Sequence, residues 1–173
     1  MITRELQDAI RMVQDFPKQG ISFCDLTPVF KQPVLVRKMV EALVEPFRNQ
    51  GITAIAGIES RGFFLAPAMA LELNLPFIPI RKPGKLPAST FAQSYQLEYG
   101  MDSLEIHTDA LSNRDFVMIH DDVLATGGTA RAAAQLVEQC GAKVAGFTFI
   151  IELLSLNGRE KIKTLPTTSL LTF

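Results

Sequence analysis

Short apolar runs alternate with helical patterns between residues 53 and 151, and this alternation constrains the fold more than any other feature. The runs are Thr53 to Ile58, Phe77 to Ile80, Phe116 to His120 and Val144 to Ile151. Such continuous runs are typical of strands buried on both faces of a parallel sheet. Helical patterns span about Gly62 to Leu73 and about Thr129 to Cys140. We therefore predict one α/β domain, a central and mostly parallel sheet flanked by helices, with ligands at the carboxyl ends of its strands.

The flanking regions carry weaker patterns. An apolar repeat predicts a helix from Arg4 to Phe16 that ends before the first proline, and the chain from Lys18 to Lys31 is irregular. A second helix follows and reaches Phe47, although Pro46 should shorten its end. After the last apolar run we expect a short helix and a final strand at residues 169–173.

The interval from Lys82 to Thr108 interrupts the alternation. It contains several proline and glycine residues, and two short runs within it, Tyr95 to Tyr99 and Ser103 to Thr108, predict a hairpin. A connection this long inside one domain is typical of a functional lid or binding loop. We therefore expect a flexible lid over about residues 82–108.

Composition narrows the classes of partner. The formal net charge of −1 gives no broad basic field, so nucleic acid and anionic membranes are not expected as partners. Two cysteines, Cys24 and Cys140, are too few for a disulfide framework and lack the spacing of metal ligands. The sequence has no apolar run near the ~18 residues that span a bilayer, and charges interrupt its first twenty residues. We expect a cytoplasmic protein.

The third apolar run leads into the most informative segment, FVMIHDDVLATGGT. Two adjacent carboxylates, Asp121 and Asp122, follow the predicted strand, and the next helix opens with Thr126, Gly127, Gly128 and Thr129. Glycines let backbone N–H groups approach a phosphate, threonines add hydroxyl donors, and a helix N-terminus favours an anion. Carboxylates accept hydrogen bonds from vicinal ribose hydroxyls, so the segment predicts a site for a ribose phosphate. The motifs of triphosphate and dinucleotide loops are missing from it.

This segment resembles the phosphoribosyl pyrophosphate motif of the type I phosphoribosyltransferases. The resemblance implies the fold of that family, with a small N-terminal base-binding hood over about residues 1–32. It also implies that Asp121 and Asp122 hold the ribose hydroxyls while Ala125 to Thr129 surround the 5′-phosphate. Family members that act on 6-oxopurines carry an acid at the position of Ala125, where it addresses N7 of the base. Its absence here argues against a 6-oxopurine substrate.

A second stretch, GIESRGFFLAP, places a charged turn between a strand and a helix. The forked guanidinium of Arg61 suits a phosphate, although pairing with a neighbouring carboxylate is the simpler alternative. The stretch resembles the pyrophosphate loop of the adenine-specific members of the family. By that resemblance Glu59, Ser60 and Arg61 contact pyrophosphate, and a cis peptide bond lies among them.

A third stretch, IRKPGKLPASTFAQSYQLEYG, begins at a strand end and carries three nearby positive charges, on Arg81, Lys82 and Lys85. A solvated charge cluster is the common alternative for such a run. In the family the matching residues contact pyrophosphate, partly across a dimer interface. The LEYG motif resembles the lid of the adenine-specific members. It implies that Glu98 moves the N7 proton of the base and that Tyr99 supports the reaction centre.

The N-terminal stretch QDFPKQGISFCDLTPVF resembles the base-binding segment of the family. The resemblance implies that Phe23 and Cys24, together with Leu124 and Ala125, contact the base. The family usually has arginine at the position of Cys24. Because base recognition uses backbone atoms there, the base should still bind, while its affinity and identity stay open. We interpret His120 as a packed residue at the end of a strand and not as a catalytic group.

The resemblance as a whole implies a transferase that moves the 5-phosphoribosyl group from phosphoribosyl pyrophosphate to adenine, giving AMP and pyrophosphate in purine salvage. It implies Mg²⁺ as the cofactor, held mainly by substrate and water, with Asp121 and Asp122 nearby but no direct protein ligand. It also implies a homodimer. Two alternatives stay open: a transferase for another base such as xanthine, and a non-catalytic regulator that senses phosphoribosyl pyrophosphate.

Overall fold

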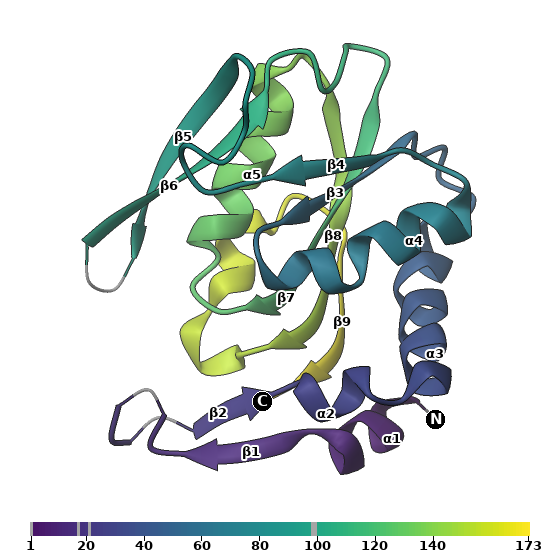
Figure 1. The fold of residues 1–173 in the computed structure, drawn as a ribbon, viewed down its shortest axis with the longest axis vertical. Coiled ribbons are helices and arrows are strands. Elements are labelled where there is room, and N and C mark those ends of the chain that lie inside the picture. The colour runs from purple at the N-terminus through teal and green to yellow at the C-terminus, as the bar shows by residue number, and fades with distance from the viewer. Residues whose placement is uncertain (1, 17, 21, 98–99) are drawn as a thin grey trace.

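A computed structural model describes residues 2–16, 18–20, 22–97 and 100–173. Its centre is a five-stranded parallel sheet in the order β4-β3-β7-β8-β9 (Figure 1). The strands are β3 (Ala54–Ile58), β4 (Phe77–Ile80), β7 (Phe116–Leu124), β8 (Lys143–Glu152) and β9 (Thr167–Thr172). This sheet and its flanking helices confirm the predicted fold class.

Helices cover both faces of the sheet. α3 (Pro33–Val44) and α4 (Ala66–Leu73) contribute to the hydrophobic cluster on one face, and α5 (Gly128–Gln139) contributes to the cluster on the other (Figure 1). The chain winds from β3 to β4 through α4 and from β7 to β8 through α5, in opposite directions along the sheet. The winding therefore reverses between β3 and β7, the place where open α/β sheets leave a crevice at their carboxyl ends.

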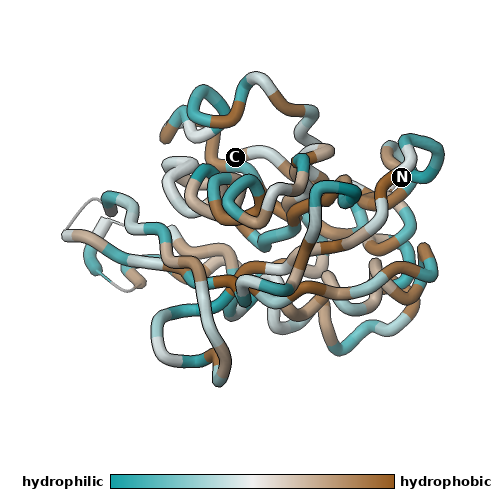
Figure 2. The backbone as a smooth tube through the Cα atoms, turned by 90° about the horizontal axis from the view of Figure 1, so that it is seen from above, coloured by the Kyte–Doolittle hydropathy of each residue, from teal (hydrophilic) through white to brown (hydrophobic). Residues whose placement is uncertain are grey.

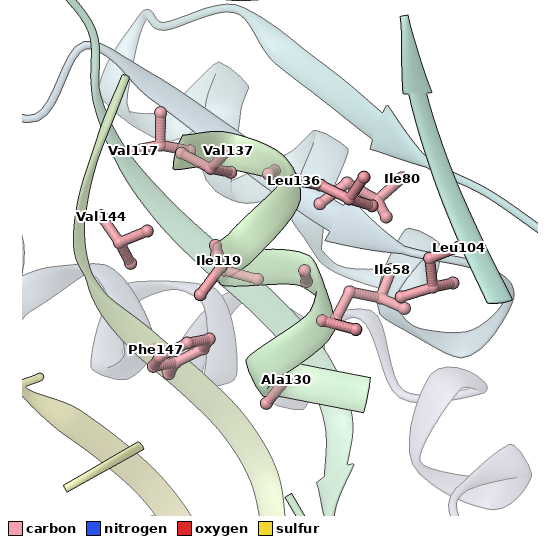
Figure 3. Close-up of a cluster of buried hydrophobic side chains, with 14 of the residues drawn as sticks. Ile58, Ile80, Leu104, Val117, Ile119, Ala130, Leu136, Val137, Val144 and Phe147 are labelled. Atoms are coloured by element: carbon pink, nitrogen blue, oxygen red, sulfur yellow. The ribbon is translucent and has the colours of Figure 1, made fainter. Parts of the chain in front are cut away.

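Alternate strand residues supply the two hydrophobic clusters. Figure 3 shows Ile58, Ile119 and Phe147, from β3, β7 and β8, facing the side of the sheet on which Leu136 and Val137 of α5 lie. Hydrophobic segments run through the middle of the molecule, and many peripheral loops are hydrophilic (Figure 2). Because both faces are covered, the strands appear in the sequence as continuous apolar runs.

The first 32 residues differ from the prediction. α1 (Ile2–Ala9) is followed by β1 (Arg11–Gln14), which pairs antiparallel with β2 (Ser22–Asp25), and α2 (Thr27–Phe30) comes next. The predicted helix from Arg4 to Phe16 was therefore wrong beyond Ala9, and the stretch expected to be irregular contains β2 and α2. The apolar repeat that suggested a helix also fits a strand whose partner lies across a turn.

The hairpin predicted within the long interval is present and longer than expected. β5 (Thr90–Leu97) and β6 (Gly100–His107) pair antiparallel, and β5 packs along α5 (Figure 1). Where a short helix was expected after β8, the chain forms two 3-10 helices, Leu154–Leu156 and Gly158–Ile162. The expected final strand follows as β9. Within the described ranges, no helix has the length and apolar character needed to cross a bilayer.

Candidate active site

A polar cavity of about 380 Å³ lies at the carboxyl ends of β3, β4 and β7. Its lining residues come from all three stretches that the sequence singled out and from the hairpin: Glu59, Ser60, Arg61, Lys82, Tyr95, Asp102, Asp121, Asp122 and Thr129. Parallel strands bring these distant segments to one edge of the sheet, as the alternation predicted.

The two adjacent carboxylates lie within β7 and not after it. The strand continues to Leu124, so its predicted end at His120 was wrong, because residues up to Leu124 keep their pairing with β8. Asp122 is only 4% exposed. The Nε of Arg61 lies 2.8 Å from its Oδ2 as an ion pair, although the angles are not those of a hydrogen bond. The simpler role considered for Arg61, pairing with a carboxylate, is thus observed.

Burial raises the pKa of the Asp121 carboxyl well above its usual range, and the negative charge of Asp122 raises it further. Burial also raises the pKa of Asp122, while Arg61 opposes that change. The backbone N–H of Asp122 donates a hydrogen bond of 2.8 Å to Asp121 Oδ1. Two neighbouring carboxylates with so little compensation favour a ligand that brings hydroxyl donors or a cation.

The turn after β3 packs directly against β7. A Cβ atom added to Gly62 would lie 2.8 Å from the carbonyl oxygen of His120, so a side chain there would push the turn away from the carboxylates. The peptide bond between Glu59 and Ser60 is cis, in agreement with the expected cis bond in this turn. Glycine at position 62 therefore keeps Arg61 close to Asp122.

Glu59 connects the ends of β3 and β4. Its carboxylate accepts hydrogen bonds of 3.1 and 3.2 Å from Arg81 and one of 3.0 Å from the backbone N–H of Lys82. Although burial opposes the change, these donors lower the pKa of Glu59. Arg81 also donates to the carbonyl oxygen of Lys85, whose side chain is exposed. Of the three basic residues predicted at this strand end, Lys82 alone is among the residues that line the polar cavity.

The loop predicted to hold a 5′-phosphate is tightly packed. Gly127 caps α5 with a φ of 74°, and an added Cβ would lie 2.2 Å from the carbonyl oxygen of Gly158. In the reverse direction, a Cβ on Gly158 would lie 2.1 Å from the carbonyl oxygen of Ala125. Thr129 lines the polar cavity at the N-terminus of α5. Both glycines are needed for this backbone path.

An apolar cavity of about 350 Å³ adjoins the polar one. It is lined by Phe16, Phe23, Asp25, Leu26, Thr27, Phe30, Arg61, Phe64 and Asp122. Arg61 and Asp122 line both cavities, and the Arg61 guanidinium lies 5.6 Å from the centre of the Phe23 ring. Flat aromatic walls beside a charged rim suit a planar heterocycle.

Of the residues predicted to contact a base, Phe23 lines the apolar cavity and Cys24 does not. The Cys24 sulfur instead lies 3.6 Å from the sulfur of Met12, its partner across the β1–β2 pair. Leu124 is 1% exposed and packs in the hydrophobic cluster between α5 and the sheet. Ala125 lies against Gly158.

Several lining residues were missed from the sequence, among them Phe16, Phe30 and Phe64. Phe16 and Phe30 lie in the N-terminal stretch that resembles the base-binding segment, and Phe64 lies in the stretch GIESRGFFLAP, but neither resemblance identified these rings individually. Glu98 and Tyr99, predicted for proton transfer and its support, lie outside the described residues.

His120 is fully buried, and its Nδ1 lies 3.0 Å from Thr148 Oγ1. Burial lowers the pKa of this imidazole to about 3, so it is neutral at physiological pH. These features agree with a packed residue within the sheet.

Comparison with known proteins was consistent with this geometry. A family model described as a phosphoribosyl transferase domain matches residues 28–168. An adenine phosphoribosyltransferase of Synechococcus sp. is 50% identical over 98% of this chain and 99% of its own length. A crystal structure of adenine phosphoribosyltransferase from Rhodothermus marinus is 51% identical, with a TM-score of 0.93, over 99% of this chain and 98% of that one.

A structure from Saccharomyces cerevisiae, in complex with adenine and D-2,5-dideoxy-2,5-imino-altritol 1,6-bisphosphate, is 42% identical. It has a TM-score of 0.92 over 98% of each chain.

Proposed function

The chain belongs to the phosphoribosyltransferase family, and we propose that it is an adenine phosphoribosyltransferase, which joins adenine to phosphoribosyl pyrophosphate and releases AMP and pyrophosphate. The observation that carries this proposal is the pair of adjoining cavities, one polar and one aromatic, with Arg61 and Asp122 in both linings. A reaction between a charged sugar phosphate and a flat base needs two such compartments that meet at the reacting atoms.

Each substrate fits one compartment. The phosphoribosyl group lies in the polar cavity, and adenine lies among the aromatic rings of the apolar cavity, next to Phe23. Pyrophosphate leaves C1 of the ribose, which becomes oxocarbenium-like, and N9 of the base attacks from the opposite side. The shared wall holds the two reactants in line, and this positioning supplies a large part of the rate.

Asp121 and Asp122 accept hydrogen bonds from the ribose hydroxyls. Burial raises the pKa values of both carboxyls, and the charge of Asp122 further raises that of Asp121; hydroxyl donors and a divalent cation stabilise the ionised carboxylates. In the described part of the chain, there is no cluster of three or more His, Cys, Asp or Glu side chains suited to a metal ion. Two carboxylates nevertheless fit Mg²⁺, which keeps waters and substrate oxygens as most of its ligands. When bound, Mg²⁺ neutralises charge on the pyrophosphate oxygens.

The 5′-phosphate lies at the loop of Ala125, Thr126, Gly127, Gly128 and Thr129. The N-terminus of α5 and the backbone N–H groups of this loop favour an anion. Its close packing on Gly158 supports the role, because a preformed loop loses little conformational entropy when the phosphate binds.

Cationic side chains stabilise the charge of the leaving pyrophosphate. The cationic residues Arg61 and Lys82 line the polar cavity, and Ser60 and Glu59 lie beside them in its lining. Arg81 and the exposed Lys85 are not among the lining residues of this chain's cavity, so we assign them to the pyrophosphate of a partner subunit in a homodimer.

An exposed apolar surface on and beside α4 supports the homodimer. Leu71 of α4 is 83% exposed, and Phe64, at the end of the 3-10 helix that precedes α4, is 56% exposed although it also lines the apolar cavity. Sedimentation of the wild-type protein and of Leu71→Glu tests this assignment. A dimer that dissociates in the variant supports it, and a wild-type monomer at micromolar concentration contradicts it.

Glu98 supplies the proton chemistry at N7 of adenine, with Tyr99 as its support, and replaces the acid that 6-oxopurine enzymes carry at the position of Ala125. Replacement of Glu98 by glutamine should lower kcat strongly. Unchanged turnover would remove this assignment.

Residues 82–108 act as the lid and residues 1–32 as the base-binding hood. The cytoplasmic location stays a prediction of the sequence, which cell fractionation would check.

The direct test is turnover of the purified protein with phosphoribosyl pyrophosphate, Mg²⁺ and either adenine, hypoxanthine, guanine or xanthine. We expect AMP formation with adenine and at least 100-fold slower reaction with the other bases. Faster reaction with xanthine would favour the alternative base. Binding of phosphoribosyl pyrophosphate without turnover of any base would favour the sensor.

A further inference from the structure

The ammonium of Lys82 has two partners on the hairpin that lies over the polar cavity. Its Nζ donates a hydrogen bond of 2.9 Å to Tyr95 Oη and forms an ion pair with Asp102 Oδ2. Tyr95 Oη also donates to the same carboxylate oxygen, at 3.1 Å. All three side chains line the cavity, next to Asp121 and Asp122.

These contacts connect two different parts of the molecule. Lys82 follows the end of β4, whereas Tyr95 and Asp102 face each other across the β5–β6 hairpin. Close by, the carbonyl oxygen of Gln96 lies 3.2 Å from where a Cβ on Gly128 would be, so the hairpin also touches the phosphate loop. The Lys82 contacts are therefore one of the ties between hairpin and sheet.

A hydrogen bond within the hairpin orients the Asp102 carboxylate toward Lys82. The second oxygen of that carboxylate accepts a hydrogen bond of 2.8 Å from the backbone N–H of Ser103. The side chains of Lys82 and Asp102 are 36% and 30% exposed, however, so water and incoming ions reach the pair. Ion pairs with this exposure contribute little to stability and exchange readily.

We propose that Asp102 is an internal competitor of pyrophosphate for the Lys82 ammonium and thereby sets the affinity of the enzyme for that product. This inference rests on the proposed function, in which Lys82 binds pyrophosphate. When pyrophosphate enters, its oxygens replace the Asp102 carboxylate at Nζ, and the hairpin loses one tie to β4. When pyrophosphate leaves, Asp102 takes the ammonium back.

Two physical effects act in the same direction. A carboxylate on the same chain presents a high effective concentration, so a ligand must displace it before it can use Lys82. The negative charge of Asp102 also repels a polyanion in the same cavity, where water only partly screens the interaction. Asp102 therefore weakens pyrophosphate binding and favours product release.

The test is calorimetric titration of the full-length protein with inorganic pyrophosphate and Mg²⁺. For Asp102→Asn we expect binding about three- to tenfold tighter than wild type. Asp109→Asn is the matched control, because it removes the same charge from an exposed position beyond β6, and it should change the affinity less than twofold. Tyr95→Phe keeps the competing carboxylate and should not reproduce the gain.

The sign of the change separates this proposal from a structural role. If Asp102 merely anchors the hairpin, its loss weakens pyrophosphate binding, and weaker or unchanged affinity overturns the proposal. Asp102→Ser, with a smaller side chain, must show the same tightening if Asp102→Asn is poorly folded. Wild-type turnover of adenine is measured in parallel: its failure would contradict the proposed function, whereas an active wild type without tightening in the variants would contradict this inference alone.

Discussion

The two cavities at the edge of the sheet adjoin each other and are built in opposite ways. The polar cavity takes its residues from the turns after β3 and β4, from β7 itself, from the hairpin and from the start of α5, and short contiguous motifs contain most of them. The apolar cavity takes Phe16, Phe23 and Phe30 from the N-terminal segment and adds Phe64 from the turn after β3. Binding of a charged phosphate requires a backbone placed at a fixed position. Stacking on a flat base requires only an aromatic ring at the right distance, and any helix, strand or loop can supply it. The contrast shows why motifs identified most residues of the polar cavity one by one, whereas in the apolar cavity the N-terminal resemblance identified the segment and, among its rings, Phe23 alone.

Replacement of Arg61 by glutamine should have the largest effect, because this residue belongs to both cavities. We expect kcat/KM to fall about 100-fold or more, which is typical when a charged donor at the reaction centre is lost. Steady-state kinetics should show higher KM values for both substrates. Arg48→Gln is the control, since Arg48 pairs with Glu45 and Glu72 away from either cavity. A KM change for one substrate alone would show that the cavities act independently.

Replacement of Phe23 by alanine should affect the apolar cavity alone. Loss of the ring beside the base should raise the KM for adenine about tenfold, from lost stacking and contact area. The KM for phosphoribosyl pyrophosphate should stay within twofold, because Phe23 does not line the polar cavity. Equal changes in both KM values would mean that the ring shapes the whole site.

Replacement of Asp121 by asparagine should make the free protein more stable at pH 8. The folded-state pKa of this carboxyl is raised, so ionisation destabilises the folded protein as pH rises through that pKa. The variant should gain about 0.5–2 kcal/mol at pH 8, the range common when an unfavourable charge is removed. Urea unfolding should show this gain vanishing below pH ~4, where the carboxyl is protonated in both folded and unfolded wild type. A gain that persists there would indicate a packing effect.

Replacement of Cys24 by arginine, the residue usual in the family, should have the smallest effect. The Cys24 side chain contacts Met12 and does not line the apolar cavity, so the KM for adenine should change less than about twofold. Cys24→Ala controls for loss of the sulfur contact. A large change in base preference would show that this position acts on the base after all.

The sheet was predictable because burial on both faces leaves its mark on consecutive residues. Ala54–Ile58 is buried at every position and appears in the sequence as an uninterrupted apolar run. The same argument located the carboxylates and the charged turn at Arg61, since ligands of such sheets bind at strand ends.

The N-terminal region was not predictable by the same means. Val13 lies in β1 because it pairs with Phe23, and a contact across a turn leaves no period in the sequence. An apolar residue every third or fourth position then fits a helix equally well. The end of β7 was placed too early for a related reason: Asp122 is polar, yet its strand continues in register with β8. Burial of functional polar groups breaks the pattern on which prediction relies.

Gly127 and Gly158 lie far apart in the sequence, yet neither position can acquire a side chain while the other keeps its backbone path. No single substitution at one of them can be compensated by a substitution at the other, because glycine is already the smallest residue. The pair should therefore resist drift over evolutionary time, even though Gly158 belongs to a connection that carries no proposed catalytic group. A variant at position 158 would therefore lose activity through the phosphate loop, although its position would suggest a defect of the C-terminal segment.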